Sequence, residues 1–289
     1  MAYVKASDGT ALYYEDYGAG KPVVFIHSWP LSSRMWEYQT VPLSKQGIRC
    51  IAYDRRGFGK SDHAARGYDY NTLADDLKTI LDTLDLNDVT LIGFSMGGGE
   101  VARYMSRHGG ARVVKVALIS SVTPFLLKAA DNVGGVDATI FEKMMDGLQK
   151  DRPAFLTEFA NGFFNVGVLA SPVSNPMLAA TCEDAMRASA IGTLECVKAF
   201  SETDFRADMG SITVPTLIIH GDDDKTVPIE ASGHMTARLL PHAQFEVYSG
   251  APHGLYFADK DRLNGDLAKF VLGAGAGNSV GGRHLKTAA

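Results

Sequence analysis

The chain has 289 residues, of which 46% are hydrophobic and 21% are charged. This composition predicts a folded globular protein and argues against disorder as the dominant state. The 28 Lys and Arg residues stand against 33 Asp and Glu residues, giving a formal net charge of −5 with neither sign gathered into a long block. Such a distribution offers no footprint for nucleic acid and favours a small neutral or weakly polar ligand. No apolar run approaches the ~20 residues that cross a bilayer, so we expect no membrane partner.

The cysteines and the amino-terminal segment bear on the cellular compartment. Cys50, Cys182 and Cys196 stand at unrelated spacings, and the segment MAYVKASDGT lacks an apolar secretory core. An odd number of unpatterned cysteines without a secretory signal is typical of a reducing compartment. We therefore expect a cytoplasmic protein.

Short apolar runs recur through most of the chain, with helical patterns between them. Residues 3–6 and 11–17 flank SDGT and predict a β-hairpin. Further strands, apolar on both faces, are predicted at Pro22 to Ser28, Arg49 to Tyr53, Val89 to Phe94, Val113 to Ser120, Thr216 to His220 and Phe245 to Tyr248. Alternating buried strands and helices predict an α/β fold whose mostly parallel sheet is covered on both sides.

The clearest helical pattern runs from Tyr70 to Leu84. Its Leu and Ile residues recur at spacings of three and four, which buries one face of a helix. Asn71 is the residue that we expect to cap its amino end. A second helix is predicted from Met96 to His108.

The alternation stops between residues 121 and 210, where the sequence is helical, rich in Met and Phe, and without a convincing strand. We interpret this segment as a helical cap inserted over the carboxyl edge of the sheet. The alternative is that part of it forms another sheet-covering helix. The predicted organisation is an α/β core at 1–120 and 211–272, a cap at 121–210, and a flexible tail at 273–289.

The segment VTLIGFSMGGG, residues 89–99, places a serine between a strand and a helix. Gly93 and Gly97 leave room for a strained turn that exposes the Ser95 hydroxyl above the sheet edge. Small residues also surround serine in ordinary turns, so the motif alone leaves both interpretations open. The preceding apolar strand and the following helix favour the nucleophile elbow of a hydrolase.

A serine hydroxyl becomes a good nucleophile when a histidine, held by a carboxylate, removes its proton. His253 follows the last predicted strand in GAPHGL, and three acids, Asp222, Asp223 and Asp224, follow the strand TLIIH. The order serine, aspartate, histidine is that of α/β hydrolases. The remaining histidines lack the spacing of metal ligands, so no metal site is predicted.

The motifs HSWP, YDRRGFGKSD, GFSMGG, HGDDDKTVP and GAPHG are similar to those of the bacterial cofactor-free haloperoxidase, perhydrolase and aryl esterase family of the α/β hydrolase superfamily. The resemblance covers residues 2–272. It implies an α/β hydrolase fold with Ser95 as nucleophile, His253 as base and Asp224 as acid, and no cofactor. It also implies a homo-oligomer. Asp222 and Asp223 are then expected to bond to nearby amides.

An oxyanion hole needs two donors, and the resemblance assigns them to the backbone N–H groups of Met96 and Trp29. The first lies at the start of a helix, where unpaired N–H groups and the dipole favour negative charge. The family usually has glycine where this chain has Ser28, and a serine there needs a backbone conformation that is compatible with its Cβ.

Pro30 restricts Trp29 to extended backbone angles and so limits where the Trp29 carbonyl points. Perhydrolase-like members of the family carry Trp-Pro at this place. Our hypothesis is that this carbonyl accepts a hydrogen bond from hydrogen peroxide as the peroxide attacks an acyl enzyme. The alternative is that Pro30 only stiffens a turn.

Aromatic and apolar side chains of the predicted cap are candidates for an acyl pocket, although such residues usually belong to the core. The candidates are Phe125, Met144, Phe159, Phe163, Phe164 and Ile191, and Pro30, outside the cap, is a further candidate. His27 and His220, at strand ends, are expected to be structural hydrogen-bonding residues. The acids and arginines of YDRRGFGKSD are expected to hold a loop.

Together these features predict a serine hydrolase that forms an acyl enzyme from small aryl esters and transfers the acyl group to water or hydrogen peroxide. Two alternatives stay open at this point. The first is cleavage of a small cyclic amide by the same residues, and the second is a non-catalytic homologue that retains only the ligand cavity.

Overall fold

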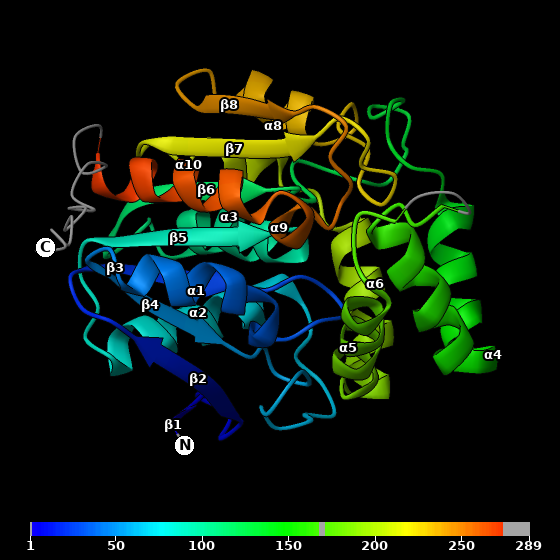
Figure 1. The fold of residues 1–289 in the computed structure, drawn as a ribbon, viewed down its shortest axis with the longest axis horizontal. Coiled ribbons are helices and arrows are strands. Elements are labelled where there is room, and N and C mark those ends of the chain that lie inside the picture. Colours follow the sequence, from blue (N-terminus) through cyan, green and yellow to red (C-terminus); the bar gives the residue numbers. More distant parts are fainter. Residues whose placement is uncertain (1, 168–170, 274–289) are drawn as a thin grey trace, which may run out of the picture.

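The computed structural model describes residues 2–167 and 171–273, and a sheet of eight strands forms its centre (Figure 1). The strands are β1 (Ala2–Lys5), β2 (Ala11–Tyr17), β3 (Lys21–Ile26), β4 (Ile48–Tyr53), β5 (Val89–Phe94), β6 (Val113–Ile119), β7 (Thr216–Gly221) and β8 (Gln244–Tyr248). Their spatial order is β1-β2-β4-β3-β5-β6-β7-β8. β2 pairs antiparallel with β1 and β4, and all other neighbours pair parallel. The mostly parallel sheet and the amino-terminal hairpin are therefore confirmed.

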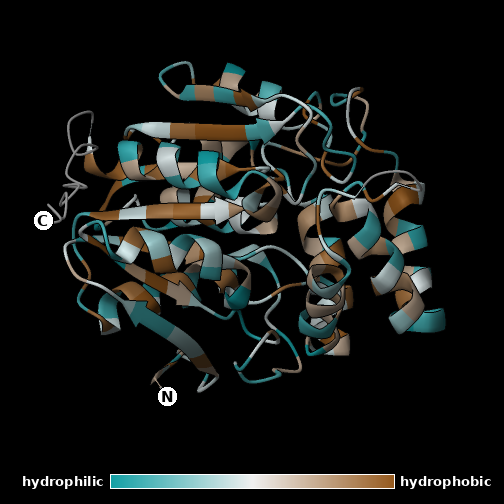
Figure 2. Cartoon of the chain, viewed as in Figure 1, coloured by the Kyte–Doolittle hydropathy of each residue, from teal (hydrophilic) through white to brown (hydrophobic). Residues whose placement is uncertain are grey.

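The inner strands are buried on both faces, as their apolar runs predict, because helices cover the sheet from both sides. Figure 2 shows these strands as the brown centre of the molecule. The prediction is wrong for β8, in which Glu246 and Val247 are exposed. β8 lies at the edge of the sheet and pairs only with β7, so its side chains are less completely covered.

Two groups of helices sandwich the sheet. Figure 1 shows α1 (Glu37–Ser44) and α10 (Lys260–Leu272) on one face, with α2 (Tyr70–Thr83), α3 (Met96–Arg107) and α8 (Gly233–Leu239) on the other. The short helix α9 (Leu255–Ala258) leads into α10, and a 3-10 turn, Ser33–Trp36, leads into α1.

The helices of the segment predicted as a cap lie beyond the carboxyl ends of the strands (Figure 1). They are α4 (Ala138–Phe163), α5 (Asn175–Met186) and α6 (Ala190–Glu202). A further short helix of the segment, α7 (Arg206–Met209), packs instead against α3 and α8. α4 is kinked at Asp151, two residues before Pro153, where the backbone leaves helical angles. The division into separate core and cap domains stays a prediction, and the predicted flexible tail lies almost wholly outside the described residues.

The amino end of α2 differs from its prediction. Asp69, in extended conformation, is the capping residue, and its carboxylate accepts hydrogen bonds from the backbone N–H groups of Asn71 and Thr72, both at 3.1 Å. Asn71 lies inside the first turn and supplies one of the N–H groups that need a partner. The prediction of Asn71 as the cap was therefore wrong by two residues.

This cap assignment predicts different costs for two substitutions. Asp69→Ala should lower the free energy of unfolding by about 1 kcal/mol, because two helix N–H groups lose their acceptor. Asn71→Ala is the matched control and should change it by less than about 0.5 kcal/mol, since its side chain is on the surface. Urea unfolding of both variants measures the difference, and equal losses would contradict the assignment.

Candidate active site

Ser95 stands at the sharp turn between β5 and α3. Its backbone φ and ψ are 54° and −116°, in a region that side chains seldom adopt. The turn is possible because glycine stands on either side: a Cβ on Gly93 would lie 2.5 Å from the Gly97 carbonyl oxygen, and one on Gly97 would lie 2.5 Å from that of Ile26. The Ser95 hydroxyl is thereby held above the carboxyl end of the sheet.

Two side chains from distant loops meet Ser95. His253 Nε2 lies 3.0 Å from Ser95 Oγ, and His253 Nδ1 lies 2.6 Å from Asp224 Oδ2. With the proton on Nδ1, the histidine donates to Asp224 and accepts from the serine hydroxyl. The structure thus brings together Ser95, His253 and Asp224, the aspartate that the family resemblance assigns as the acid.

Asp224 is buried, and all its oxygens have donors. Oδ1 accepts from the backbone N–H groups of Thr226, at 3.0 Å, and Val227, at 2.8 Å. Burial raises the pKa of this carboxyl, but His253 and His220 outweigh burial and lower the pKa below its ordinary value of 3.8. The carboxylate is therefore ionised at neutral pH.

The neighbouring acids have other partners. Asp222 accepts a hydrogen bond from the backbone N–H of Gly250 at 2.5 Å. Asp223 accepts from the Asn165 side chain at 2.7 Å. Neither distance involves the histidine, so the geometry favours Asp224 as the acid among the three.

His220 contacts this arrangement directly, which the sequence analysis did not foresee. Its Nε2 lies 2.9 Å from the Val227 carbonyl oxygen and 3.3 Å from Asp224 Oδ2, and the side chain is fully buried. The available signal was its position four residues before Asp224, at the end of the same strand. It contacts the same carboxylate oxygen as His253 and has no hydrogen bond to Ser95, so it is a structural hydrogen-bonding residue in this arrangement.

The two backbone N–H groups assigned to the oxyanion hole come from adjacent strand ends, because β3 and β5 pair with Ile26 opposite Gly93. Within the part of the chain that the structure describes, neither the Trp29 nor the Met96 N–H donates to another residue. Both are therefore available to a ligand oxygen.

Ser28 is accommodated without a left-handed backbone, since it is absent from the residues of positive φ in the described chain. Its hydroxyl donates to the Trp29 carbonyl oxygen at 2.9 Å, and its N–H faces Met35 Sδ at 3.2 Å. The Trp29–Pro30 peptide bond is cis. Serine therefore fits where the family usually has glycine.

A cavity of about 40 Å³ opens onto Ser95 and His253. Its other lining residues are mainly apolar: Trp29, Val122, Leu126, Val136, Ile140, Phe141, Met144, Phe159, Phe200, Thr226 and Val227. Of the predicted pocket residues, Phe159 and Met144 lie in this lining. Phe141, Phe200 and Leu126 were missed, because apolar spacing on a helix does not distinguish a cavity wall from core.

Five predicted pocket residues lie elsewhere, among them Phe164, which is fully buried and packs against Phe163 and Tyr256. Ile191 is 51% exposed and lines a separate surface groove beside residues 65–69, because it points outward from α6. Phe125 packs under the Arg206 guanidinium, 5.2 Å from its ring, and Pro30 is buried in its turn. Phe163 packs edge-on against the His253 ring at 4.8 Å, so it supports the base and does not line the cavity.

The charged residues of the YDRRGFGKSD segment hold their loop, as predicted. Asp54 accepts from the backbone N–H groups of Ser33 and Lys60 at 2.8 and 2.7 Å. Arg56 pairs with buried Asp76 at 2.6 Å. None of them lines the cavity at Ser95.

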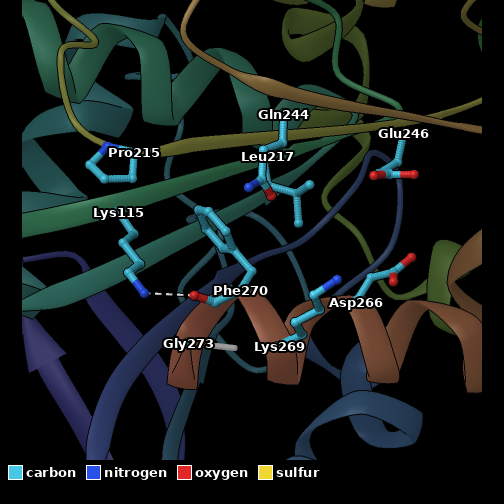
Figure 3. Close-up of a pocket in the computed structure, with 9 residues that line it drawn as sticks. All are labelled: Lys115, Pro215, Leu217, Gln244, Glu246, Asp266, Lys269, Phe270 and Gly273. Carbon is cyan, nitrogen blue, oxygen red and sulfur yellow. Dashed lines mark hydrogen bonds between the residues drawn. The ribbon is translucent and has the colours of Figure 1, made fainter. Parts of the chain in front are cut away.

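A second cavity, of about 320 Å³, lies at the opposite edge of the sheet, between the starts of β6 to β8 and the end of α10 (Figure 3). The ammonium group of Lys115, which lines this cavity, has a partner within the protein, because Nζ donates to the Phe270 carbonyl oxygen at 2.6 Å. That contact satisfies a free carbonyl at the carboxyl end of α10. This cavity is separate from the Ser95 site.

The described residues also bear on metal binding and membrane insertion. Across residues 2–167 and 171–273, no group of three His, Cys, Asp or Glu side chains is placed to hold a metal ion. Over the same ranges, no helix combines the length and apolarity that spanning a bilayer requires.

Fold and site together define a serine hydrolase architecture, and the comparisons agree with it. The model of the alpha/beta hydrolase fold family matches residues 21–260, so the chain belongs to this family. It is 42% identical to a non-heme chloroperoxidase of Kitasatospora aureofaciens, covering 94% of this chain and 99% of the relative. A bifunctional esterase/perhydrolase of Acinetobacter calcoaceticus is 36% identical with the same coverage. The crystal structure of a bromoperoxidase from Bacillus anthracis superposes with a TM-score of 0.91 at 46% identity, covering 94% and 99% of the two chains.

The environment of Asp224 predicts a pH dependence of stability. Because folding lowers the pKa of Asp224, its ionised form stabilises the fold at neutral pH, and this contribution disappears as the pH falls below about 3.8. The difference in unfolding free energy between the wild type and Asp224→Asn should therefore shrink from pH 5 to pH 3. Urea titrations at each pH measure it, and a difference that grows on acidification would contradict the assignment.

Proposed function

We propose that the chain is a serine esterase that transfers acyl groups from small esters to water and to hydrogen peroxide. The observation that carries this proposal is the continuous hydrogen-bonded series from Asp224 through His253 to Ser95, at the floor of an apolar cavity. A binding protein has no need for a hydroxyl held in a strained turn and aligned with a histidine.

The first half of the reaction forms an acyl enzyme. Ser95 Oγ attacks the ester carbonyl while His253 Nε2 takes the hydroxyl proton, and ionised Asp224 stabilises the imidazolium that results. The negative oxygen of the tetrahedral intermediate accepts hydrogen bonds from the N–H groups of Trp29 and Met96. His253 then returns the proton to the departing alcohol.

The second half releases the acyl group. A water molecule loses a proton to His253, attacks the acyl carbon and displaces Ser95 Oγ, which regains the proton, so that a carboxylic acid leaves. Hydrogen peroxide attacking in the same way releases a peracid. A peracid and a halide ion, with one proton, yield the carboxylic acid and a hypohalous acid in solution, which connects this mechanism with the haloperoxidase names of the relatives.

The cavity favours small neutral acyl groups. Its volume is about 40 Å³, and apart from the catalytic residues its lining is almost wholly apolar. An apolar wall of this kind carries no partner for a charged acyl chain. Short-chain aryl esters, whose phenolate is a good leaving group, are therefore the substrates that we propose.

We also propose that the protein is cytoplasmic, which its three free cysteines support, and that it self-associates, as the sequence resemblance implies. Light scattering on the purified full chain measures its molar mass in solution. A mass equal to the 31.1 kDa of one chain would overturn the proposed oligomer.

Substitution of the nucleophile tests the mechanism. Ser95→Ala should lower hydrolysis of a short-chain aryl acetate, and peracid formation with it, by at least about 10³-fold, because both need the same acyl enzyme. A fluorophosphonate should label the wild type and not the variant. Peracid formation that survives in Ser95→Ala would contradict a shared intermediate, and absence of labelling in the wild type would favour a non-catalytic protein.

Substitution of Pro30 tests the proposed transfer of the acyl group to hydrogen peroxide. The Trp29 carbonyl already accepts from Ser28, but a carbonyl oxygen has a second lone pair for hydrogen peroxide. Pro30→Leu frees the backbone of Trp29, so the ratio of peracid to carboxylic acid should fall while ester hydrolysis continues. Both products are measured in one reaction. An unchanged ratio would leave Pro30 as a structural turn residue only.

A further inference from the structure

A buried ion pair that the proposed mechanism does not use lies beside the active site. Arg55 donates to Glu100 through its Nε and Nη2 atoms, and both side chains are almost completely removed from solvent. The other oxygen of Glu100 accepts from the Tyr53 hydroxyl at 2.7 Å. Replacing such a pair by apolar residues is often neutral or stabilising, so stability alone gives no reason for placing two charges here.

One end of this pair leads to the Met96 side of the oxyanion hole. Glu100 lies on α3 four residues after Met96, which puts the two residues next to each other on one face of the helix. The α3 helix is itself continuous with the Ser95 turn. The contacts of Glu100 therefore help to fix the position of the first turn of α3, which carries the Met96 N–H.

The other end leads to the Trp29 side. Arg55 Nη2 donates to the His27 carbonyl oxygen at 2.8 Å, and the Arg55 backbone N–H donates to His27 Nε2 at 2.9 Å. Because Nε2 is an acceptor, the proton of this histidine is on Nδ1. Burial, and then the charge of Arg55, lower the pKa of His27 well below its ordinary value, which keeps the ring neutral.

His27 in turn holds the peptide group that carries the second donor. Its Nδ1 donates to the Ser28 carbonyl oxygen at 2.7 Å. This carbonyl and the Trp29 N–H belong to one planar peptide unit and point in opposite directions across it. Fixing the carbonyl fixes the direction of the N–H, and a hydrogen bond to the carbonyl makes that N–H a stronger donor.

We propose that Glu100, Arg55 and His27 are positioning residues that set the separation and direction of the two oxyanion donors. We call these three residues the positioning relay. The proposal rests on the proposed function, since it concerns the hydrogen bonds that a tetrahedral intermediate receives. None of the three side chains lines the cavity at Ser95, so the relay acts through the backbone of Trp29 and Met96.

The test compares two neighbouring buried ion pairs. Glu100→Gln removes the charge of the relay, whereas Asp76→Asn is the matched control, because Asp76 pairs with Arg56, next in sequence to Arg55, and is equally buried. The Arg56 side chain bonds to Asp76, Asp8 and the Arg66 carbonyl and makes no contact with His27 or Ser28. The control therefore has a comparable stability cost without reaching an oxyanion donor.

For Glu100→Gln we expect kcat for a short-chain aryl acetate to fall by about 10- to 100-fold, since a small misplacement of a donor has effects of this size. KM should change by less than about threefold, because the hydrogen bonds strengthen mainly in the transition state. The affinity for a boronic acid, which forms a tetrahedral adduct with serine, should fall in parallel with kcat. Asp76→Asn should change kcat by less than about threefold.

His27→Phe supplies a second variant at the other end of the relay. It retains a ring against Phe58 but removes the hydrogen bond to Ser28, and we expect the same loss of kcat. If the relay acts as one unit, the double variant Glu100→Gln/His27→Phe should lose little more than either single variant. This arm keeps the proposal testable should Glu100→Gln fail to fold.

Three results would overturn the relay. They are unchanged kcat and boronic acid affinity in folded Glu100→Gln or His27→Phe, an equal fall of kcat in Asp76→Asn, and losses that simply add in the double variant. Ser95→Ala, assayed beside them, separates this failure from that of the proposed function. Wild-type turnover no higher than that of Ser95→Ala would refute the esterase itself.

Discussion

The close contact between the Ser95 turn and strand β3 is the constraint on which the rest of the site depends. Gly97 lies so near the Ile26 carbonyl that a Cβ there would stand 2.5 Å from its oxygen. This approach places the start of α3 beside the loop that follows β3, so the nucleophile and both candidate oxyanion donors lie at adjacent strand ends. A larger residue at position 97 would separate all three at once. The positive φ of Ser95 is therefore maintained by the close packing of the start of α3 against β3 and β5.

The charged groups of the site are arranged so that each buried charge has a partner. Asp224 receives two backbone N–H groups besides its histidines, and Arg55 and Glu100 neutralise each other within the core. Unpaired, any of these groups would change its protonation or destabilise the fold. The same contacts connect loops that are far apart in the sequence. The contacts that compensate the cost of burying these charges therefore also fix the positions of the loops that form the site.

The apolar side of the site has a different source. Residues 121–210, helices and loops together, contribute most of the cavity lining, and the rest of the chain contributes the reactive groups. Phe159 packs against the Trp29 indole at 5.0 Å, and the indole N–H donates to the Thr193 carbonyl oxygen at 3.0 Å. The loop that carries a candidate oxyanion donor is thus also held by helices α4 and α6. Substrate size and donor geometry are consequently coupled through one residue.

The sequence by itself determined where the sheet strands lie along the chain and in which order the candidate catalytic residues follow them. These residues are the serine between glycines and, after later strands, the acid and the histidine. These features are local, because apolar periodicity and turn chemistry depend on neighbouring residues. Only the tertiary structure decided which of three adjacent aspartates contacts His253, that His220 contacts the same aspartate, and that Ile191 points away from the cavity while Phe141 and Phe200 line it. Those outcomes depend on contacts between separate loops, such as the contact of Asp224 with His253, 29 residues later, or on the rotation of a helix against its neighbours. Neither is encoded in the spacing of residues along one segment.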